Sequence, residues 1–237
     1  MLSLKNLSIS VEGKKIIEDF SFEFERGKVY AVMGPNGSGK STLAYSIMGH
    51  PAYALGKKSK LVFNGKDITK LDIEKRAKAG IFLSFQSPLS LSGVKLYQML
   101  QFALAGLKDA LTIRREVQEY AKKLKINPDL LTRSLNEGAS GGEKKKLEVL
   151  QAAVLDKELL IFDEVDTGVD VDALRTIAQF LDSTKKDKTY IIITHYNRIL
   201  KYLKPDFVLV VKNGELKKVG DSTLATEIEK QGYADFD

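Results

Sequence analysis

Hydrophobic and polar residues alternate along the first 33 residues of the chain. The stretches "LSLKNLSISV" and "FSFEFERGKVYAVM" place apolar residues near every second position, which is typical of half-buried strands. The residues "EGK" at 12–14 separate the two stretches as a turn, so we expect an N-terminal antiparallel β subdomain. The run "VYAVM" at 29–33 is apolar throughout, as in a strand that is buried on both faces.

The pattern changes to helical periodicity after about residue 88. Within 88–140, "VKLYQMLQFALAGL" and "IRREVQEYAKKLKI" repeat apolar residues at helical spacing, and a further helix is expected over 141–154. Strand-like and helix-like stretches then alternate: "ELLIFDE", "DALRTIAQFLDS", "TYIIITH", "NRILKYL" and "DFVLVVKNGELKKVG". This alternation is typical of a parallel sheet. We therefore predict an α/β fold in a single domain over 1–237, with a catalytic core formed by 1–87 and 141–237 and an inserted α-helical subdomain at about 88–140.

The composition excludes several kinds of chemistry. The 237 residues include no cysteine and two histidines, which excludes disulfides and thiolate metal sites within this chain. The net charge of +6 favours anionic ligands, but the lysine clusters lack the interleaved aromatic residues of a single-strand binder, so no nucleic-acid partner is expected. No apolar run has the length of a membrane helix, and the N-terminus lacks the pattern of a signal peptide. We expect a cytoplasmic protein that is not inserted in a membrane.

A glycine-rich loop follows the buried strand at 29–33. The segment "GPNGSGKST" matches G-x-x-x-x-G-K-[ST] and opens the helical stretch "KSTLAYSIMG", the context that this phosphate-binding motif requires. Its backbone N–H groups would face the phosphates, Lys40 would reach the β- and γ-phosphates, and the Ser41 hydroxyl would coordinate Mg²⁺. The predicted nucleotide ligands in this loop are Gly34, Pro35, Asn36, Gly37, Ser38, Gly39, Lys40, Ser41 and Thr42.

Polar residues follow three further strand-like runs. Asp163 and Glu164 end "LLIFDE", where Asp163 could bind the Mg²⁺ held by the phosphates and Glu164 could orient or deprotonate a water. His195 follows "YIIIT" and Gln86 follows "IFLSF". Each is a weak signal alone, but beside a phosphate loop both are candidates for groups that face the γ-phosphate.

The segment around Ser140 has two interpretations. Residues 138–142 spell G-x-S-x-G, and Asp163 and His195 follow in the order of a hydrolase triad. A nucleophile elbow needs a strand before the serine, however, and "LLTRSLNEG" does not read as one. The alternative is that Ser140 caps a helix that begins with two glycines, which makes a second anion-binding helix terminus for the nucleotide of another copy of the chain. A serine esterase, the function that a Ser140 nucleophile would imply, is therefore the least favoured hypothesis for the function.

Together these motifs resemble the ABC-type ATPases over nearly the whole chain. The resemblance rests on the Walker A loop at 34–42, the Q-loop residue Gln86, the signature "ASGGE" at 139–143, the Walker B strand at 159–164, the D-loop at 167–170 and the switch residue His195. It implies a P-loop ABC ATPase core with a mixed, largely parallel sheet, ATP and Mg²⁺ as ligands, and a transient ATP-dependent homodimer that holds two ATP molecules between its subunits.

The resemblance also implies a role for each matching residue. Ser140 and Gly142 of one subunit would contact the γ-phosphate held by Lys40 of the other. The implied catalytic residues are Lys40, Gln86, Glu164 and His195, the implied metal ligands are Ser41, Gln86 and Asp163, and the implied nucleotide ligands of the signature are Ser140, Gly141, Gly142 and Glu143.

Several longer segments narrow the resemblance. "LNEGASGGEKKK", "DEVDTGVDVDAL" and "THYNRILKYLKPDFV" closely resemble the SufC-type ATPases of the Suf iron–sulfur cluster assembly machinery. This implies a complex with a SufB or SufD-type scaffold, docked around residues 86–106, whose conformation changes when the ATPase subunits dimerise. The alternative is the cytoplasmic ATPase subunit of an ABC membrane transporter, which has the same catalytic motifs.

One position departs from the pattern of transport ATPases. Those proteins usually have an aromatic residue on an early strand that stacks on adenine, and the equivalent residue here is Val11. We therefore expect nucleotide binding to depend mainly on phosphates and Mg²⁺, with modest discrimination between ATP and GTP.

Overall fold

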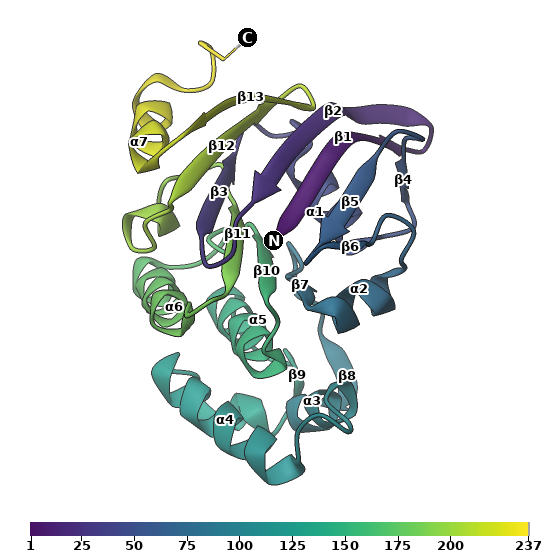
Figure 1. Cartoon of the computed structure of the whole chain (residues 1–237). Helices are drawn as coiled ribbons and strands as arrows, with labels where there is room; N and C mark the ends of the chain where they lie inside the picture. The colour runs from purple at the N-terminus through teal and green to yellow at the C-terminus, as the bar shows by residue number, and fades with distance from the viewer. Residues whose placement is uncertain (237) are drawn as a thin grey trace.

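The computed structural model describes residues 1–236, which form two large β-sheets and a small two-stranded one, with helices packed around them (Figure 1). The first sheet is antiparallel, and its strands follow the order β2-β1-β5-β6, with β4 pairing β1. Glu12 and Gly13, both with positive φ, form the tight turn between β1 and β2, which confirms the predicted antiparallel opening. The strands are β1 (Leu2–Val11), β2 (Lys14–Phe24), β4 (Tyr53–Leu55), β5 (Lys60–Phe63) and β6 (Lys66–Asp67).

The second sheet has the order β13-β12-β3-β11-β10-β7 and is parallel except for β13. Every residue of β3, β10 and β11 is buried, which explains why these strands are continuously apolar in the sequence. The strands are β3 (Val29–Met33), β7 (Ile81–Leu83), β10 (Leu159–Asp163), β11 (Thr189–Ile193), β12 (Phe207–Lys212) and β13 (Glu215–Gly220).

The second sheet separates two hydrophobic clusters. Val29, Ala31 and Met33 of β3 face one cluster, while Tyr30 and Val32 face the other, because successive side chains of a strand point to opposite faces. The first cluster contains residues of α3 (Leu96–Ala103), α4 (Ala110–Lys123), α5 (Gly141–Leu155) and α6 (Val171–Thr184). The second contains residues of α1 (Lys40–Met48) and of the antiparallel sheet. The chain thus forms helical layers on one face of the parallel sheet and a β-layer with α1 on the other.

Between β7 and α5 the chain forms the helices that the periodicity predicted. These lie at the lower end of the molecule in Figure 1, beneath α5. A short antiparallel ladder of β8 and β9, which the sequence did not predict, connects their two ends. The elements are β8 (Leu91–Lys95), α3 (Leu96–Ala103), α4 (Ala110–Lys123), a 3-10 turn η1 (Pro128–Leu131) and β9 (Ser134–Leu135). No helix within residues 1–236 has the length and apolar character needed to cross a bilayer.

The structure differs from the predicted elements near the C-terminus. The predicted helix at "NRILKYL" is only a 3-10 turn, η2 (Ile199–Lys201). Pro205 disfavours helical geometry at Lys204, so the turn cannot continue as a helix beyond this stretch. The last predicted strand is a hairpin of β12 and β13 that turns at Asn213 and Gly214. Two short helices, α2 (Ile73–Ala79) and α7 (Ser222–Gln231), were not predicted.

The register of the parallel strands determines which residues meet at the sheet edge. Leu83 of β7 pairs with Ile161 of β10, and Asp163 of β10 pairs with Ile193 of β11. Gln86 and Glu164 therefore both stand three residues beyond a paired position. The carboxyl ends of β3, β7, β10 and β11 consequently open onto the same edge.

The turn at Gly214 connects the C-terminal hairpin to the glycine-rich loop after β3 and to β2 of the antiparallel sheet. The Gly214 N–H donates to the Ser38 carbonyl at 3.1 Å, and its carbonyl accepts from the Glu18 N–H at 3.2 Å. Its φ is +79°, and a Cβ at this position would lie 2.1 Å from the Ile16 carbonyl oxygen. Gly65 has nearly the same φ, +78°, but a Cβ there would meet nothing within 4 Å.

We predict that Gly214→Ala destabilises the protein more than Gly65→Ala. The left-handed conformation costs each variant about 1–2 kcal/mol, and the clash at Gly214 adds roughly 1–3 kcal/mol. The free energy of unfolding from urea denaturation measures both losses. Equal losses in the two variants would contradict the close packing of this turn.

Candidate active site

The loop between β3 and α1 has a backbone that only glycine permits at several positions. A Cβ on Gly34 would lie 2.0 Å from the Val211 carbonyl oxygen, and Gly37 and Gly39 have φ of +78° and +102°. Gly39 is the N-cap residue of α1, and no side chain caps this helix terminus. The first N–H groups of α1 are therefore available to an anion.

This loop forms one wall of a cavity of about 440 Å³. The volume lies within the range of small-molecule sites, roughly 300–1,000 Å³. The cavity brings together residues that follow four strands of the parallel sheet. Its lining residues are Ile16, Asn36, Gly37, Ser38, Gly39, Lys40, Ser41, Thr42, Gln86, Glu164 and His195. Ile16 was not predicted, and it lines the cavity where Val11 does not.

Lys40 points back onto its own loop. Its Nζ donates to the carbonyl oxygens of Gly34 and Pro35, both at 2.9 Å, and the side chain is buried. Burial lowers the pKa of Lys40, and the carboxylates of Glu164 and Asp163 oppose this shift. Since carbonyl oxygens are its partners, the ammonium group is ready to exchange them for phosphate oxygens.

Asp163 is a fully buried carboxylate at the end of β10. Neither of its oxygens accepts a hydrogen bond from another group within residues 1–236, although its backbone N–H donates to Ser84 Oγ at 2.9 Å. Burial raises the pKa of Asp163, and the nearby Ser41 hydroxyl lowers it, so the loop serine and the strand carboxylate face each other. Unpartnered buried carboxylate oxygens beside a hydroxyl fit the oxygen ligands that Mg²⁺ prefers.

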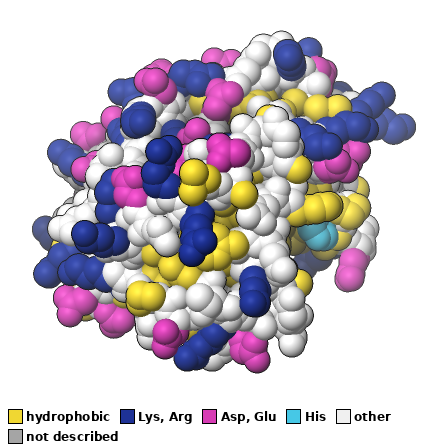
Figure 2. Space-filling model, turned by 90° about the horizontal axis from the view of Figure 1, so that it is seen from below, with side chains coloured by type: hydrophobic (Ala, Val, Ile, Leu, Met, Phe, Trp, Pro, Cys, Tyr) yellow, Lys and Arg dark blue, Asp and Glu magenta, His cyan; other side chains and the backbone are white. Residues whose placement is uncertain are grey.

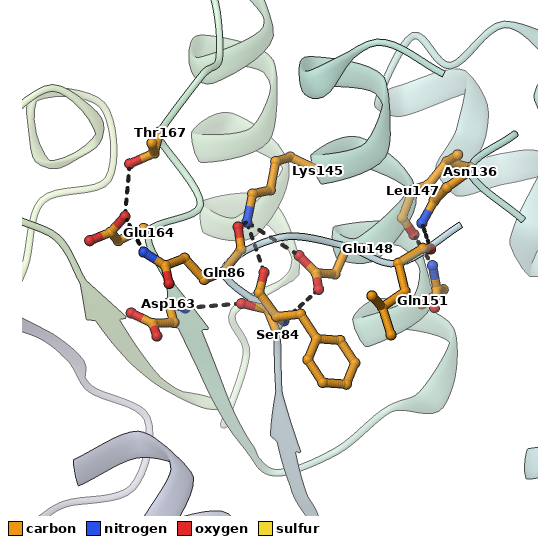
Figure 3. Close-up of polar contacts among 12 residues, drawn as sticks. Ser84, Gln86, Asn136, Lys145, Leu147, Glu148, Gln151, Asp163, Glu164 and Thr167 are labelled. Atoms are coloured by element: carbon orange, nitrogen blue, oxygen red, sulfur yellow. Dashed lines mark hydrogen bonds and ion pairs between the residues drawn. The ribbon is translucent and has the colours of Figure 1, made fainter. Parts of the chain in front are cut away.

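Glu164 is hydrogen-bonded by Gln86 and Thr167, as Figure 3 shows, and it also lies near His195. Its Oε2 accepts from Gln86 Nε2 at 3.0 Å and from Thr167 Oγ1 at 3.3 Å, while its Oε1 lies 3.5 Å from His195 Nδ1. The residue has φ of +52°, and its N–H donates to the Ile193 carbonyl at 2.9 Å. Such strain in a non-glycine residue is typical of functional sites. The structure thus brings together three strand-end residues that the sequence identified separately.

The signature lies outside this cavity, at the N-terminus of α5. Ser140 caps the helix, and its hydroxyl donates to Glu143 Oε2 at 2.8 Å, with the backbone N–H of Ser140 donating to the same oxygen at 2.9 Å. These bonds, above all that from the Ser140 backbone, lower the pKa of Glu143. Gly141 packs so closely that a Cβ would lie 3.1 Å from the Gly168 carbonyl oxygen, so the signature and the D-loop are in contact.

This geometry contradicts the nucleophile-elbow interpretation of Ser140. Its hydroxyl contacts Glu143 and not His195, and its φ of −63° is not the strained conformation of an elbow. No strand leads directly into it, because β9 ends at Leu135. A serine-esterase triad of Ser140, His195 and Asp163 therefore does not form within this chain.

Comparison with known proteins agrees with this architecture. The sequence profile described as ABC transporter matches residues 17–167. The chain belongs to the ABC transporter family. It is 45% identical to the probable ATP-dependent transporter SufC of Escherichia coli strain K12, over 98% of this chain and 97% of that protein. It is 43% identical to the probable ATP-dependent transporter slr0075 of Synechocystis, over 98% of this chain and 94% of that protein.

The comparison with solved structures concerns the fold. The dimeric post-hydrolysis structure of the ATP-binding cassette MJ0796, bound to ADP and phosphate, superposes with a TM-score of 0.80. It covers 94% of this chain and 99% of that chain at 19% identity, so the likeness concerns the fold. The protein is therefore an ABC-type ATPase that resembles SufC, and the predicted fold class is confirmed.

Behind the cavity, this ABC ATPase has a buried ion pair that the sequence did not reveal. Lys145 and Glu148 stand on α5, with 3% and 5% of their surface exposed. Both contact the backbone of the Q-loop, which we define as residues 84–90. Burial raises the pKa of Glu148 to about 7, and the Lys145 ammonium is the main opposing influence. The only hint in the sequence is that both charges fall among the apolar residues of "KKKLEVL".

Proposed function

We propose that this ATPase binds ATP with Mg²⁺ in the phosphate-loop cavity and uses Glu164 as the general base. The observation that carries the proposal is the Glu164 carboxylate in the lining of this cavity, which accepts hydrogen bonds from Gln86 and Thr167 and lies 3.5 Å from His195 Nδ1. A positioned carboxylate of this kind can orient a water and accept its proton. Lys40 would exchange its carbonyl partners for the β- and γ-phosphates, and His195 would contact the γ-phosphate.

The metal ligands in this proposal are Ser41, Asp163 and Gln86. The unpartnered oxygens of Asp163 and the facing Ser41 hydroxyl support the first two, and Gln86 has a free amide oxygen because only its Nε2 is engaged by Glu164. When bound, Mg²⁺ would neutralise charge on the β- and γ-phosphate oxygens.

We predict that Glu164→Gln stops turnover while ATP still binds. The amide keeps the size of the side chain but cannot accept a proton, and loss of a general base typically lowers kcat by about 10²–10⁴-fold. Steady-state phosphate release and nucleotide affinity measure the two effects separately. Glu137→Gln, a change at an exposed residue outside the cavity, is the matched control. Turnover near the wild-type rate in Glu164→Gln would remove this residue from the role of base.

The signature residues fit a site that two copies of the chain share. Ser140 is exposed and the signature stands apart from the phosphate loop of its own subunit, at the N-terminus of the 15-residue helix α5. Such a terminus attracts anions. Ser140, Gly141, Gly142 and Glu143 would therefore contact the nucleotide of a second subunit, which makes the active form a transient ATP-dependent homodimer.

We predict that two inactive variants restore activity when they are mixed. Lys40→Ala lacks the cationic phosphate ligand, and Ser140→Ala lacks the signature hydroxyl, but a mixed dimer contains one intact composite site. Equal mixing should give about a quarter of wild-type turnover, since half of the dimers are mixed and one of their two sites is intact. As the control, Lys40→Ala mixed with the Lys40→Ala/Ser140→Ala double variant should stay inactive. Absence of recovery at every ratio would argue against the shared site.

We further propose that ATP-driven dimerisation of this subunit powers a conformational change in a SufB or SufD-type scaffold during iron–sulfur cluster assembly. The similarity to SufC supports this role. So does the apolar surface near the Q-loop and α3, where large exposed hydrophobic side chains are more typical of a protein interface than of free surface. They are Phe85, Leu89, Leu91, Val94 and Phe102. Figure 2 shows hydrophobic side chains gathered between charged ones on the face seen from below.

The alternative is an ATPase subunit of a membrane transporter, acting in the cytoplasm. The relatives are named probable ATP-dependent transporters, which favours this alternative. The absence of cysteine fits the scaffold role, because a cluster would be held by the partner.

We predict that Phe102→Glu weakens binding to a purified SufB–SufD scaffold by about tenfold or more, because a central apolar anchor commonly contributes over 1 kcal/mol. Phe102 is 87% exposed on α3. Val219→Glu is the control, since Val219 is an exposed apolar residue on β13 at the opposite end of the molecule (Figure 1). Titration calorimetry with ATP and the Glu164→Gln background measures affinity. No binding by the wild-type surface, with capture of a membrane-spanning partner instead, would favour the transporter alternative.

A further inference from the structure

Lys145 and Glu148 form hydrogen bonds with the backbone of two consecutive residues of the Q-loop (Figure 3). Lys145 Nζ donates to the carbonyl oxygens of Phe85 at 2.9 Å and Gln86 at 2.8 Å. Glu148 Oε1 accepts from the Phe85 N–H at 2.6 Å. Three backbone groups next to each other are thus bound by one pair of side chains on α5.

Lys145 and Glu148 lie closer to the backbone of the Q-loop than to each other. The shortest distance between Lys145 Nζ and Glu148 Oε2 is 3.8 Å, longer than any of the three bonds to the backbone, and Glu148 Oε2 accepts no hydrogen bond within residues 1–236. Burial of two charges opposes folding unless their contacts compensate. Two apolar residues would fill this space at a lower desolvation cost. What the charged pair contributes instead is its hydrogen bonds to the loop backbone.

Lys145 binds the backbone of Gln86, the residue whose side chain donates to Glu164. Gln86 is an exposed residue after the end of β7, outside the regular ladder, and its carbonyl is bound by Lys145. Its side chain then reaches Glu164 Oε2 at 3.0 Å. Without the two contacts from Lys145, no side chain within residues 1–236 would bind the Gln86 carbonyl. Other hydrogen bonds hold the loop before and after this residue, as at Phe85, Leu89 and Ser90, so the backbone at Gln86 itself could shift.

We propose that Lys145 and Glu148 are positioning residues for hydrolysis, which hold the Q-loop backbone where the Gln86 side chain meets Glu164. The proposal rests on the proposed role of Glu164 as the base. It also connects two parts of the site, because the helix that bears the pair begins at Ser140. The signature and the Q-loop are therefore tied to the same rigid element.

The test is the turnover of Lys145→Met in two backgrounds. In the wild-type background, kcat should fall about tenfold or more, since misplacing a reacting group by about 1 Å can cost on the order of 100-fold. The KM for ATP should stay within about twofold, because the phosphate loop is untouched. In a Gln86→Ala background the same change should produce no further fall, because nothing remains to be positioned.

The controls separate positioning from folding. Lys144→Met makes the same change one residue earlier on α5, where the side chain has no hydrogen bond or ion pair within residues 1–236, and should keep wild-type turnover. The double variant Lys145→Met/Glu148→Leu replaces the pair with apolar residues, so no lone buried charge remains. It should still unfold cooperatively, which shows that it folds, and still lose turnover.

Two results would overturn the proposal. One is wild-type kcat in the folded double variant. The other is an equal fall in kcat with and without Gln86, which indicates a general structural effect. Glu164→Gln, measured alongside, keeps the proposals distinct: if it is inactive while Lys145→Met is fully active, only the positioning role fails, and if it turns over normally, the general base is wrong.

Discussion

Parallel pairing brings the carboxyl ends of β3, β7, β10 and β11 to one edge of a sheet, and every candidate catalytic group of this ATPase stands at that edge. The pairs Leu83–Ile161 and Asp163–Ile193 place the residues that follow each strand at matching heights. Gln86 and Glu164 can then bond although they are far apart in the chain. A slip of one residue in either ladder would turn these side chains toward opposite faces. The chemistry of the site is therefore a consequence of strand register.

The charges at this edge are poorly compensated within the chain itself. Within residues 1–236, neither carboxylate oxygen of Asp163 and only one of Glu148 accepts a hydrogen bond, and Lys40 is bound to carbonyl groups. Buried groups of this kind oppose folding until a ligand or a neighbour satisfies them. A nucleotide with its metal ion would supply the missing partners to Asp163 and Lys40. The stability of the free protein and its affinity for the ligand are thus linked through the same buried charges.

The cavity of one subunit is lined by none of the signature residues. Ser140 bonds to Glu143 and does not line the cavity of its own subunit, which fits the proposed contact of this helix terminus with the nucleotide of a second subunit. The D-loop contacts the signature at Gly141 and the Glu164 carboxylate through Thr167, which connects the proposed dimer surface to the proposed base. The exposed apolar side chains near the Q-loop lie on the same segment as Gln86. Dimerisation, hydrolysis and a partner would then act on neighbouring parts of one structure.

The sequence by itself determined the elements whose physics is local. The glycines of the phosphate loop, the apolar runs of β3, β10 and β11, and the polar residues after them could be interpreted directly, because conformation and burial constrain the residue types there. Only the tertiary structure decided that Glu164 meets Gln86, Thr167 and His195, that Ile16 lines the cavity, and that "NRILKYL" forms just a 3-10 turn. It also revealed Lys145 and Glu148 as a buried pair, since a charged residue on a helix has the same letters whether it faces solvent or a loop. Those facts depend on long-range register and packing, which periodicity does not encode.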